Sequence, residues 1–200
     1  FYDNVSFSRN PEALNQFFRQ WVSAPGSFDS DVNVWAVSKL FDKIWKGILV
    51  THSASWISGW FTAIKNENVK AVVSYEPGSF VFPEWENMDE LAKKEWIPAP
   101  VWNVSLEDFK KLTKIPIVVY YWDNITENLT WNPGQDQWRF MYKTAKIFAE
   151  VVNKYGWDAK IVHLPDVWLY WNTHFPFSDL NNIQVADELS KWLKEKWLDK

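Results

Sequence analysis

Short runs of β-branched and aromatic residues alternate with longer stretches of helical periodicity along most of this chain of 200 residues. The strand-like runs are residues 47–51, 69–75, 115–121 and 160–164. Strands that alternate with helices at this spacing form βαβ units, in which crossover helices join parallel strands. The pattern therefore predicts an α/β fold with a mainly parallel sheet flanked by helices.

Capping residues and apolar periodicity predict the helices around these runs. The first two are expected over residues 11–22 and from Asp29 or Ser30 to residue 44. Further helices are expected near residues 55–65, 106–112, 135–155 and 183–197, and the rest of residues 81–115 is expected to be irregular. The second helix is predicted to bury an apolar stripe of Val34, Val37, Leu40, Phe41 and Ile44.

The side-chain composition excludes several classes of protein. The net charge of −4, from 21 basic and 25 acidic side chains, argues against a nucleic-acid partner, because phosphate contacts need a basic surface. No apolar run reaches the roughly 18 residues of a transmembrane helix, so no membrane span is expected. The absence of cysteine excludes disulfides, cysteine-ligated zinc and a thiol nucleophile.

Tryptophan is unusually frequent and glycine unusually rare, with 16 and 6 copies. Several tryptophans stand in turn-like sequences, among them Trp122, Trp157 and Trp171. Glycine is favoured in such turns because it accepts a positive φ without a Cβ clash, which tryptophan does not. The pattern indicates an altered or engineered sequence.

The sequence ILVTHSAS, residues 48–55, runs from an apolar strand through a tight turn into a helix. This is the setting of a nucleophile elbow, with Ser53 at the turn and small residues, Thr51 and Ser55, where strand and helix cross. The N–H of Ala54 is then a donor for an oxyanion at the helix N-terminus. The same sequence also fits a serine that only caps a helix after a strand.

A nucleophilic serine needs a base, and the chain contains three histidines. His52 is adjacent to Ser53 and points elsewhere around the turn, while His163 lies inside the last predicted strand. His174 follows that strand in a loop at the carboxyl end of the sheet, where catalytic groups of open parallel sheets gather. The order of serine first and histidine last favours His174 as the base, although it also fits a loop histidine packed among aromatic rings.

Two carboxylates are candidates for the acid that orients the base. Glu76 ends the strand that follows the elbow, and Asp123 ends the next one. Both therefore belong to the carboxyl edge of the sheet, but a turn-forming Glu-Pro-Gly and an Asx-turn or helix cap explain them equally well. The spacing leaves the choice between them open.

At this point the chain resembles a known family. The segments ILVTHSASW, FTAIKNENVKAVVSYEPGSF, VHLPDV and NTHFPFSDLNN are similar to bacterial serine esterases of the α/β-hydrolase fold. The narrower resemblance is to the branch whose acid is a glutamate on the strand after the nucleophile strand. It rests on T-H-S-x-S, Y-E-P-G and N-T-H-F-P, and extends over residues 29–197. It implies an α/β-hydrolase-like fold, or its C-terminal part alone.

The resemblance implies a Ser-His-Glu triad that cleaves carboxylic esters through an acyl-enzyme. Ser53 is then the nucleophile, His174 the base and Glu76 the acid, with Asp123 in reserve and no cofactor or metal. The aromatic residues near these positions suggest a small apolar ester as substrate, although core packing explains them as well. They are Trp60, Phe80, Phe82, Phe175 and Phe177.

The resemblance also implies one domain over residues 1–200, with cap-like and pre-elbow helices in residues 1–46 and the catalytic core in residues 47–200. The earlier strands of the family and its second oxyanion donor precede residue 1. The expected partner is therefore a missing N-terminal half or a second copy of the chain. A soluble, periplasmic or secreted location is suggested by the resemblance alone.

Three other functions compete with the esterase. Trp56, Trp168 and Trp171 stand beside the elbow and the histidine loop, and such bulk favours a catalytically dead or engineered hydrolase fold that acts as a scaffold or binding protein. A carbohydrate-binding module needs exposed tryptophans in a row, whereas these are scattered along the chain. A metallohydrolase is disfavoured because no H-E-x-x-H or comparable ligand spacing occurs.

Overall fold

The computed structural model describes residues 4–23, 26, 28–86, 88–90, 93, 101–156 and 158–200. The chain divides into two compact units, which are described separately. Unit 1 consists of Phe1–Asp29, Trp122–Asn124 and His163–Lys200, and unit 2 of Ser30–Tyr121 and Ile125–Val162. The single domain expected over residues 1–200 stays a prediction.

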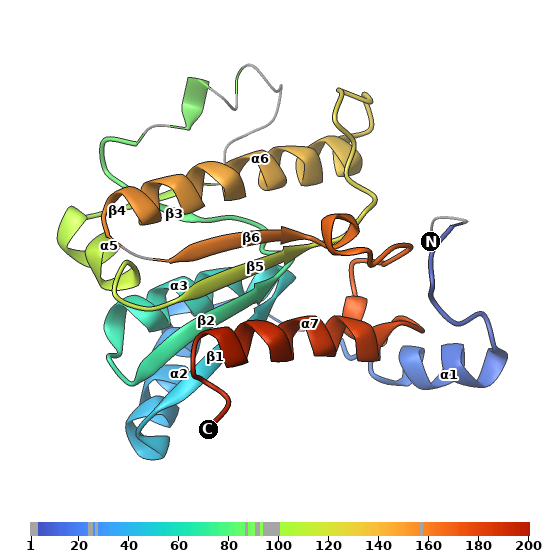
Figure 1. The fold of residues 1–200 in the computed structure, drawn as a ribbon, viewed down its shortest axis with the longest axis horizontal. Helices are drawn as coiled ribbons and strands as arrows, with labels where there is room; N and C mark the ends of the chain where they lie inside the picture. The colour runs from blue at the N-terminus through green and yellow to red at the C-terminus, as the bar shows by residue number, and fades with distance from the viewer. Residues whose placement is uncertain are drawn as a thin grey trace. The chain divides into compact units, whose positions relative to one another are not determined.

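Unit 2 is built on a four-stranded sheet in the order β1-β2-β5-β6 (Figure 1). Strand β1 (Gly47–His52) pairs in parallel with β2 (Val69–Tyr75), and β2 pairs in parallel with β5 (Ile117–Tyr121). Strand β6 (Ala159–His163) follows, and its last residue belongs to unit 1. The α/β class and the parallel sheet predicted from the alternating pattern are confirmed.

The helices of unit 2 also begin near the predicted positions. They are α2 (Ser30–Ile44), α3 (Trp56–Lys65), α5 (Leu106–Leu112) and α6 (Pro133–Lys154). Local capping explains two of these starts: the Ser105 side chain accepts from the N–H of Asp108, and the Asn132 side chain accepts from the N–H of Gly134. These caps satisfy N–H groups that have no partner inside the helix.

One face of the sheet packs against an aromatic core. Trp60 on α3 lies 5.1 Å from Phe148 on α6 and 5.8 Å from Phe80, measured between ring centroids. On the opposite face the rings of Tyr75 and Tyr120 are stacked at 4.9 Å, and both residues are buried. Both faces of β2 and β5 are thus covered, which agrees with the mostly apolar sequences of the two strands.

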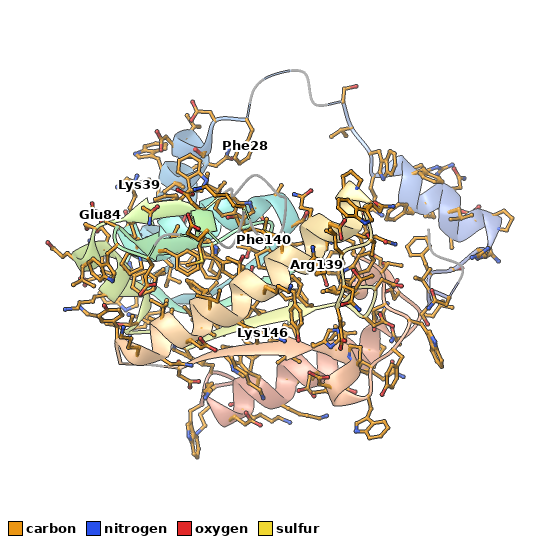
Figure 2. All side chains as sticks on the ribbon, turned by 90° about the horizontal axis from the view of Figure 1, so that it is seen from above. Phe28, Lys39, Glu84, Arg139, Phe140 and Lys146 are labelled. Carbon is orange, nitrogen blue, oxygen red and sulfur yellow. The ribbon has the colours of Figure 1, made fainter. Side chains whose placement is uncertain are left out.

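Helix α6 shows how amphipathicity positions an element (Figure 2). Phe140 is buried, and beside it Arg139 is buried with its Nε 3.4 Å from a carboxylate oxygen of Asp136. Further along, the ammonium of Lys146, which is exposed, lies 4.1 Å from the centre of the Tyr142 ring. The apolar side of the helix faces the core, and its one buried cation is paired with a carboxylate.

The apolar run of residues 47–51 predicts a buried strand, whereas β1 is only partly buried. Among the described strands β1 pairs with β2 alone, so it forms an edge of the sheet, and Val50 is 55% exposed. The stripe predicted on α2 is also only partly buried. Val34 and Phe41 are in the core, whereas Leu40 and Ile44 are 52% and 50% exposed. An apolar sequence predicts the type of secondary structure, but it does not predict how much of that strand or helix is buried by other segments.

Residues 81–115 contain more regular structure than expected. Strands β3 (Val81–Pro83) and β4 (Trp102–Val104) form a separate two-stranded parallel sheet. Both strands have three residues, too few for a hydrophobic alternation to be recognised in the sequence. The short helix predicted in this region is confirmed as α5.

Unit 1 contains α1 (Pro11–Arg19) and α7 (Asn182–Glu195), both near their predicted positions. A cluster of aromatic rings ties α1 to the loop before α7, since Phe17 lies 5.0 Å from Phe7 and 5.8 Å from Phe175. In the described part of the chain, no helix combines the length and the apolar character needed to cross a membrane.

In the described part of the chain, five tryptophans adopt the left-handed backbone conformation. Their φ angles are 76° at Trp45, 60° at Trp131, 65° at Trp168, 66° at Trp171 and 58° at Trp197. All five side chains are exposed. The sequence-based interpretation that tryptophan occupies turn positions suited to glycine is confirmed at Trp171. The Trp157 position lies outside the described residues, and Trp122 is not among the residues with a positive φ.

Candidate active site

Ser53 lies at a sharp bend between β1 and α3. Its φ is 50°, in the left-handed region that side chains other than glycine rarely adopt. A one-turn 3₁₀ helix (Ser53–Ser55) follows and leads directly into α3. Ala54 is exposed within this turn, where backbone N–H groups have no partner from a preceding helical turn. A strained serine at a strand-to-helix junction is the geometry of a nucleophile elbow.

Small side chains allow β1 and α3 to cross closely beneath the bend. A Cβ atom placed on Gly59 of α3 would lie 2.6 Å from the Thr51 methyl carbon. The hydroxyl of Thr51 donates to the hydroxyl of Ser74 at 2.9 Å, across the β1–β2 pair. On the other side of the bend, the Ser55 hydroxyl accepts from the N–H of His52 at 2.8 Å. The role predicted for a small Thr51 is thus explained by contact with the helix.

Glu76 occupies the matching position at the end of β2. The β1–β2 register pairs His52 with Tyr75, so Ser53 and Glu76 are the next residues at the same edge of the sheet. Glu76 is wholly buried and has a φ of 51°, nearly the value at Ser53. Two residues further, the N–H of Gly78 donates to the carbonyl of Ser53 at 3.5 Å. The fold therefore links the Glu-Pro-Gly turn directly to the elbow.

Hydrogen bonds from the core hold this turn in place. The N–H of Glu76 donates to the carbonyl of Tyr120 at 2.9 Å, and the Tyr121 hydroxyl donates to the carbonyl of Pro77 at 3.1 Å. Burial raises the pKa of Tyr121 well above its usual value, and the nearby charges of Glu76 and Tyr142 raise the same pKa further. Tyr121 consequently stays protonated and keeps donating its hydrogen bond.

Trp56, the first residue of α3, lies against this turn. A Cβ atom placed on Gly78 would be 3.2 Å from the indole of Trp56. The aromatic residues considered as a substrate pocket include three that are fully buried members of the core: Trp60, Phe80 and Phe82. Those three rings pack the interior of the fold, whereas Phe177 is 48% exposed.

His174 lies in unit 1, in the loop between β6 and α7. It is half-buried, and its ring centroid is 6.2 Å from that of Trp122 and 5.2 Å from that of Phe175. Its neighbour Thr173 is only 4% exposed. These ring contacts and the burial of Thr173 restrict the position of the imidazole.

Asp123 is also in unit 1, and its carboxylate binds the backbone of the histidine loop. One oxygen accepts from the N–H of Trp171 and the other accepts from the N–H of Asn172, the latter at 2.8 Å. Both oxygens of this alternative acid are thus occupied by main-chain donors. These bonds join Asp123 to residues 48 and 49 positions away and anchor the loop, whereas the local alternative considered from the sequence was an Asx-turn or helix cap.

A buried carboxylate in the loop between β6 and α7 was missed by the sequence analysis. Asp179 is 1% exposed and accepts from the backbone N–H and the hydroxyl of Thr173, at 2.7 and 2.9 Å. Burial raises its pKa, although the hydrogen bonds from Thr173 and Asn172 oppose that effect. Thr173 and Asp179 are six positions apart in a loop rich in aromatic residues. No recognised turn motif predicts a hydrogen bond at that spacing, so the sequence offered no signal for this pair.

The other two histidines stand at the ends of strands. His52 is the last residue of β1, and His163 is the last residue of β6 with its Nδ1 3.6 Å from a carboxylate oxygen of Asp166. Among the described residues, no group of three or more His, Cys, Asp or Glu side chains has the arrangement of a metal site.

The four proposed catalytic side chains are divided between the two units. Ser53 and Glu76 lie in unit 2 at one edge of its sheet, and His174 and Asp123 lie in unit 1. The structure of unit 2 thus brings the predicted nucleophile and the predicted acid to adjacent positions. The complete triad is not contained within either unit.

Comparison with known proteins supports a hydrolase-like fold. No protein-family model matches the chain, and no curated protein matches it. A solved structure described as the atomic-resolution structure of a novel bacterial esterase is similar, with a TM-score of 0.72 and 28% sequence identity. The match covers 97% of this chain and 52% of that chain, so this chain spans about half the length of the esterase. Its α/β fold, with a parallel sheet flanked by helices, resembles part of an esterase of the α/β-hydrolase type.

Proposed function

We propose that this chain carries the catalytic residues of a serine esterase. The observation that supports this most directly is the left-handed conformation of Ser53 at the β1–α3 junction, with the Glu76 turn bonded to its carbonyl. Such a bend presents a serine hydroxyl together with backbone donors of a helix start. The likeness to a bacterial esterase favours the same chemistry.

In the proposed reaction the Ser53 hydroxyl attacks the carbonyl carbon of a small apolar ester. His174 takes the hydroxyl proton and returns it to the departing alcohol, and Glu76 holds the imidazole in the required tautomer. The N–H of Ala54 donates to the oxyanion. Water then attacks the acyl-serine with the same base, which releases the carboxylic acid and restores Ser53.

An inactive hydrolase fold that serves as a scaffold or binding protein is the second candidate. The observation that favours it is Trp56, whose indole lies against Gly78 beside the elbow. A ring at this place occupies space next to the proposed nucleophile.

A covalent probe distinguishes the two candidates. We expect an organophosphate to label this protein at a single serine, and peptide mapping to identify that serine as Ser53, because only an activated hydroxyl reacts rapidly. Protein denatured before addition of the probe is the control and should remain unlabelled. Absence of labelling at Ser53 in the native protein would support the inactive fold.

A further inference from the structure

A buried hydrogen-bond chain spans both sides of His174. The Asp179 carboxylate accepts from the N–H and from the hydroxyl of Thr173, the residue before the histidine. The same Thr173 hydroxyl oxygen accepts from the N–H of Phe175, the residue after the histidine, at 3.0 Å. The backbone is therefore held before and after the imidazole by one carboxylate acting through one hydroxyl.

This chain lies in the interior of unit 1. Asp179 and Thr173 are 1% and 4% exposed, and Asn172 is fully buried. The Asn172 side chain donates to the same Asp179 carboxylate at 3.1 Å and to the Asn181 side chain at 2.8 Å. Hydrogen bonds to an ionised carboxylate are short and strong, and burial keeps water from competing for them. A network of this kind reduces the motion of the loop more than a surface turn does.

We propose that Asp179 and Thr173 are positioning residues, which fix the backbone on both sides of His174 for ester hydrolysis. The inference rests on the proposed function, because it assigns these residues to the base of that reaction. They do not touch the reacting atoms. Their role is to keep the imidazole at the place where it accepts the serine proton, and a displacement of about 1 Å costs on the order of 10²-fold in rate.

Two substitutions of Thr173 test the role of the hydroxyl. Thr173→Val removes the hydroxyl at nearly constant volume, and Thr173→Ser keeps the hydroxyl and removes the methyl group. We expect kcat for a p-nitrophenyl ester to fall about 10–100-fold in Thr173→Val, while KM stays within about twofold. Thr173→Ser should retain a kcat near that of the unsubstituted protein. Each rate is divided by the concentration of active sites, which is titrated with an organophosphate. A loss of folded protein then does not lower the measured kcat.

The outcomes separate this inference from the proposed function. Thr173→Val with an unchanged kcat, or Thr173→Ser with an equal loss, overturns the positioning role while an inactive Ser53→Ala variant still supports the esterase. A Ser53→Ala variant as active as the unsubstituted protein refutes the esterase, and the positioning role with it. Asp179→Asn is the second test of the same network. It replaces one accepting oxygen by a donor and should lower kcat at least as much as Thr173→Val.

A separate observation concerns the tryptophans with left-handed backbones. Of the seven described non-glycine residues with positive φ, five are tryptophan, and the other two are Ser53 and Glu76. A bulky side chain at such a φ is strained, whereas glycine is not. The five indoles are 58–83% exposed and therefore gain little burial in return. Glycine would relieve the backbone strain at each of these five positions.

We also infer that this protein, as its own ribosomes make it, carries glycine at these five positions. Some genetic codes read a codon as glycine that others read as tryptophan. When the same DNA is translated with the other code, tryptophan appears wherever that codon encodes glycine. Such a replacement accounts both for the turn positions and for the opposite departures of the two residue counts, 16 tryptophans and 6 glycines.

Peptide mass mapping of the protein from its natural source tests this inference. We expect glycine masses at positions 45, 131, 168, 171 and 197, and tryptophan masses there would overturn it. Recombinant variants give a second test. Glycine at all five positions should raise the melting temperature by about 10 °C, whereas alanine at all five, which retains a Cβ, should not. Equal melting temperatures for the glycine and alanine variants would also overturn the inference.

Discussion

Ser53→Ala is expected to reduce the hydrolysis of a p-nitrophenyl ester by at least about 10³-fold in kcat/KM. In the proposed reaction this hydroxyl forms the acyl-enzyme, and alanine offers no nucleophile in its place. A loss of this size corresponds to about 4 kcal/mol of transition-state stabilisation. Steady-state kinetics with enzyme purified from identical expressions measure it.

Ser58→Ala is the matched control for this substitution. Ser58 lies on α3, five residues after the proposed nucleophile, and is half-buried. Its replacement removes a serine hydroxyl from the helix that follows the bend and should leave kcat/KM unchanged. Equal rates for the unsubstituted protein and Ser53→Ala would end the catalytic proposal, whatever the control shows.

Glu76→Gln is expected to lower kcat by about 10³–10⁴-fold, since a neutral amide favours the wrong imidazole tautomer and no longer stabilises the imidazolium. The substitution preserves the shape of a side chain that is wholly buried. The hydrogen bonds of the turn involve main-chain atoms of Glu76 and its neighbours, and these remain available. The protein should therefore stay folded, and the loss should appear in kcat expressed per titrated active site.

Asp123→Asn is expected to lower the stability of the protein more than its activity, in contrast to Glu76→Gln. An asparagine has one accepting oxygen, so one of the two N–H groups now bonded by Asp123, from Trp171 and Asn172, faces an amide donor. The loss of a hydrogen bond to a charged group costs about 1.5–3 kcal/mol. We expect a lower melting temperature and a smaller decrease in kcat than for Glu76→Gln.

Kinetics and thermal unfolding of the two variants, measured side by side, decide between the acids. A larger decrease in kcat for Asp123→Asn than for Glu76→Gln would move the orienting role to Asp123. In that case the bonds between Asp123 and the loop backbone would have to be exchanged for a bond to the imidazole during the reaction.

Local sequence was sufficient for most of the secondary structure. Strand β2 begins and ends at the predicted residues, and so does helix α5. Residues 69–75 are rich in β-branched and other apolar residues, and Ser105 supplies a side-chain cap for α5. Both signals act over one or two turns of chain and need no tertiary partner. The elbow belongs to the same class, because the strand, the tight turn and the helix are adjacent in sequence.

The errors concern the number of neighbours of each element. The apolar residues predicted a buried strand at β1 and one apolar stripe on α2, but β1 is a sheet edge in the described structure and Leu40 and Ile44 on α2 are half exposed. The short pair β3 and β4 was missed because three residues carry too little pattern. How much of a strand or helix is buried depends on segments that are distant in the chain, and a local sequence pattern does not specify those segments.

The sequence by itself determined the α/β class, the position of Ser53 at a strand-to-helix bend and the mismatch between tryptophan and turn geometry, because each depends on the conformational preferences of a few consecutive residues. Tertiary structure alone decided that Glu76 ends next to Ser53 through the β1–β2 register. It also decided that Asp123 bonds the loop backbone and that Asp179 holds the chain on both sides of His174. Those contacts require strand pairing or a folded loop, and their donors and acceptors meet only after the chain has folded.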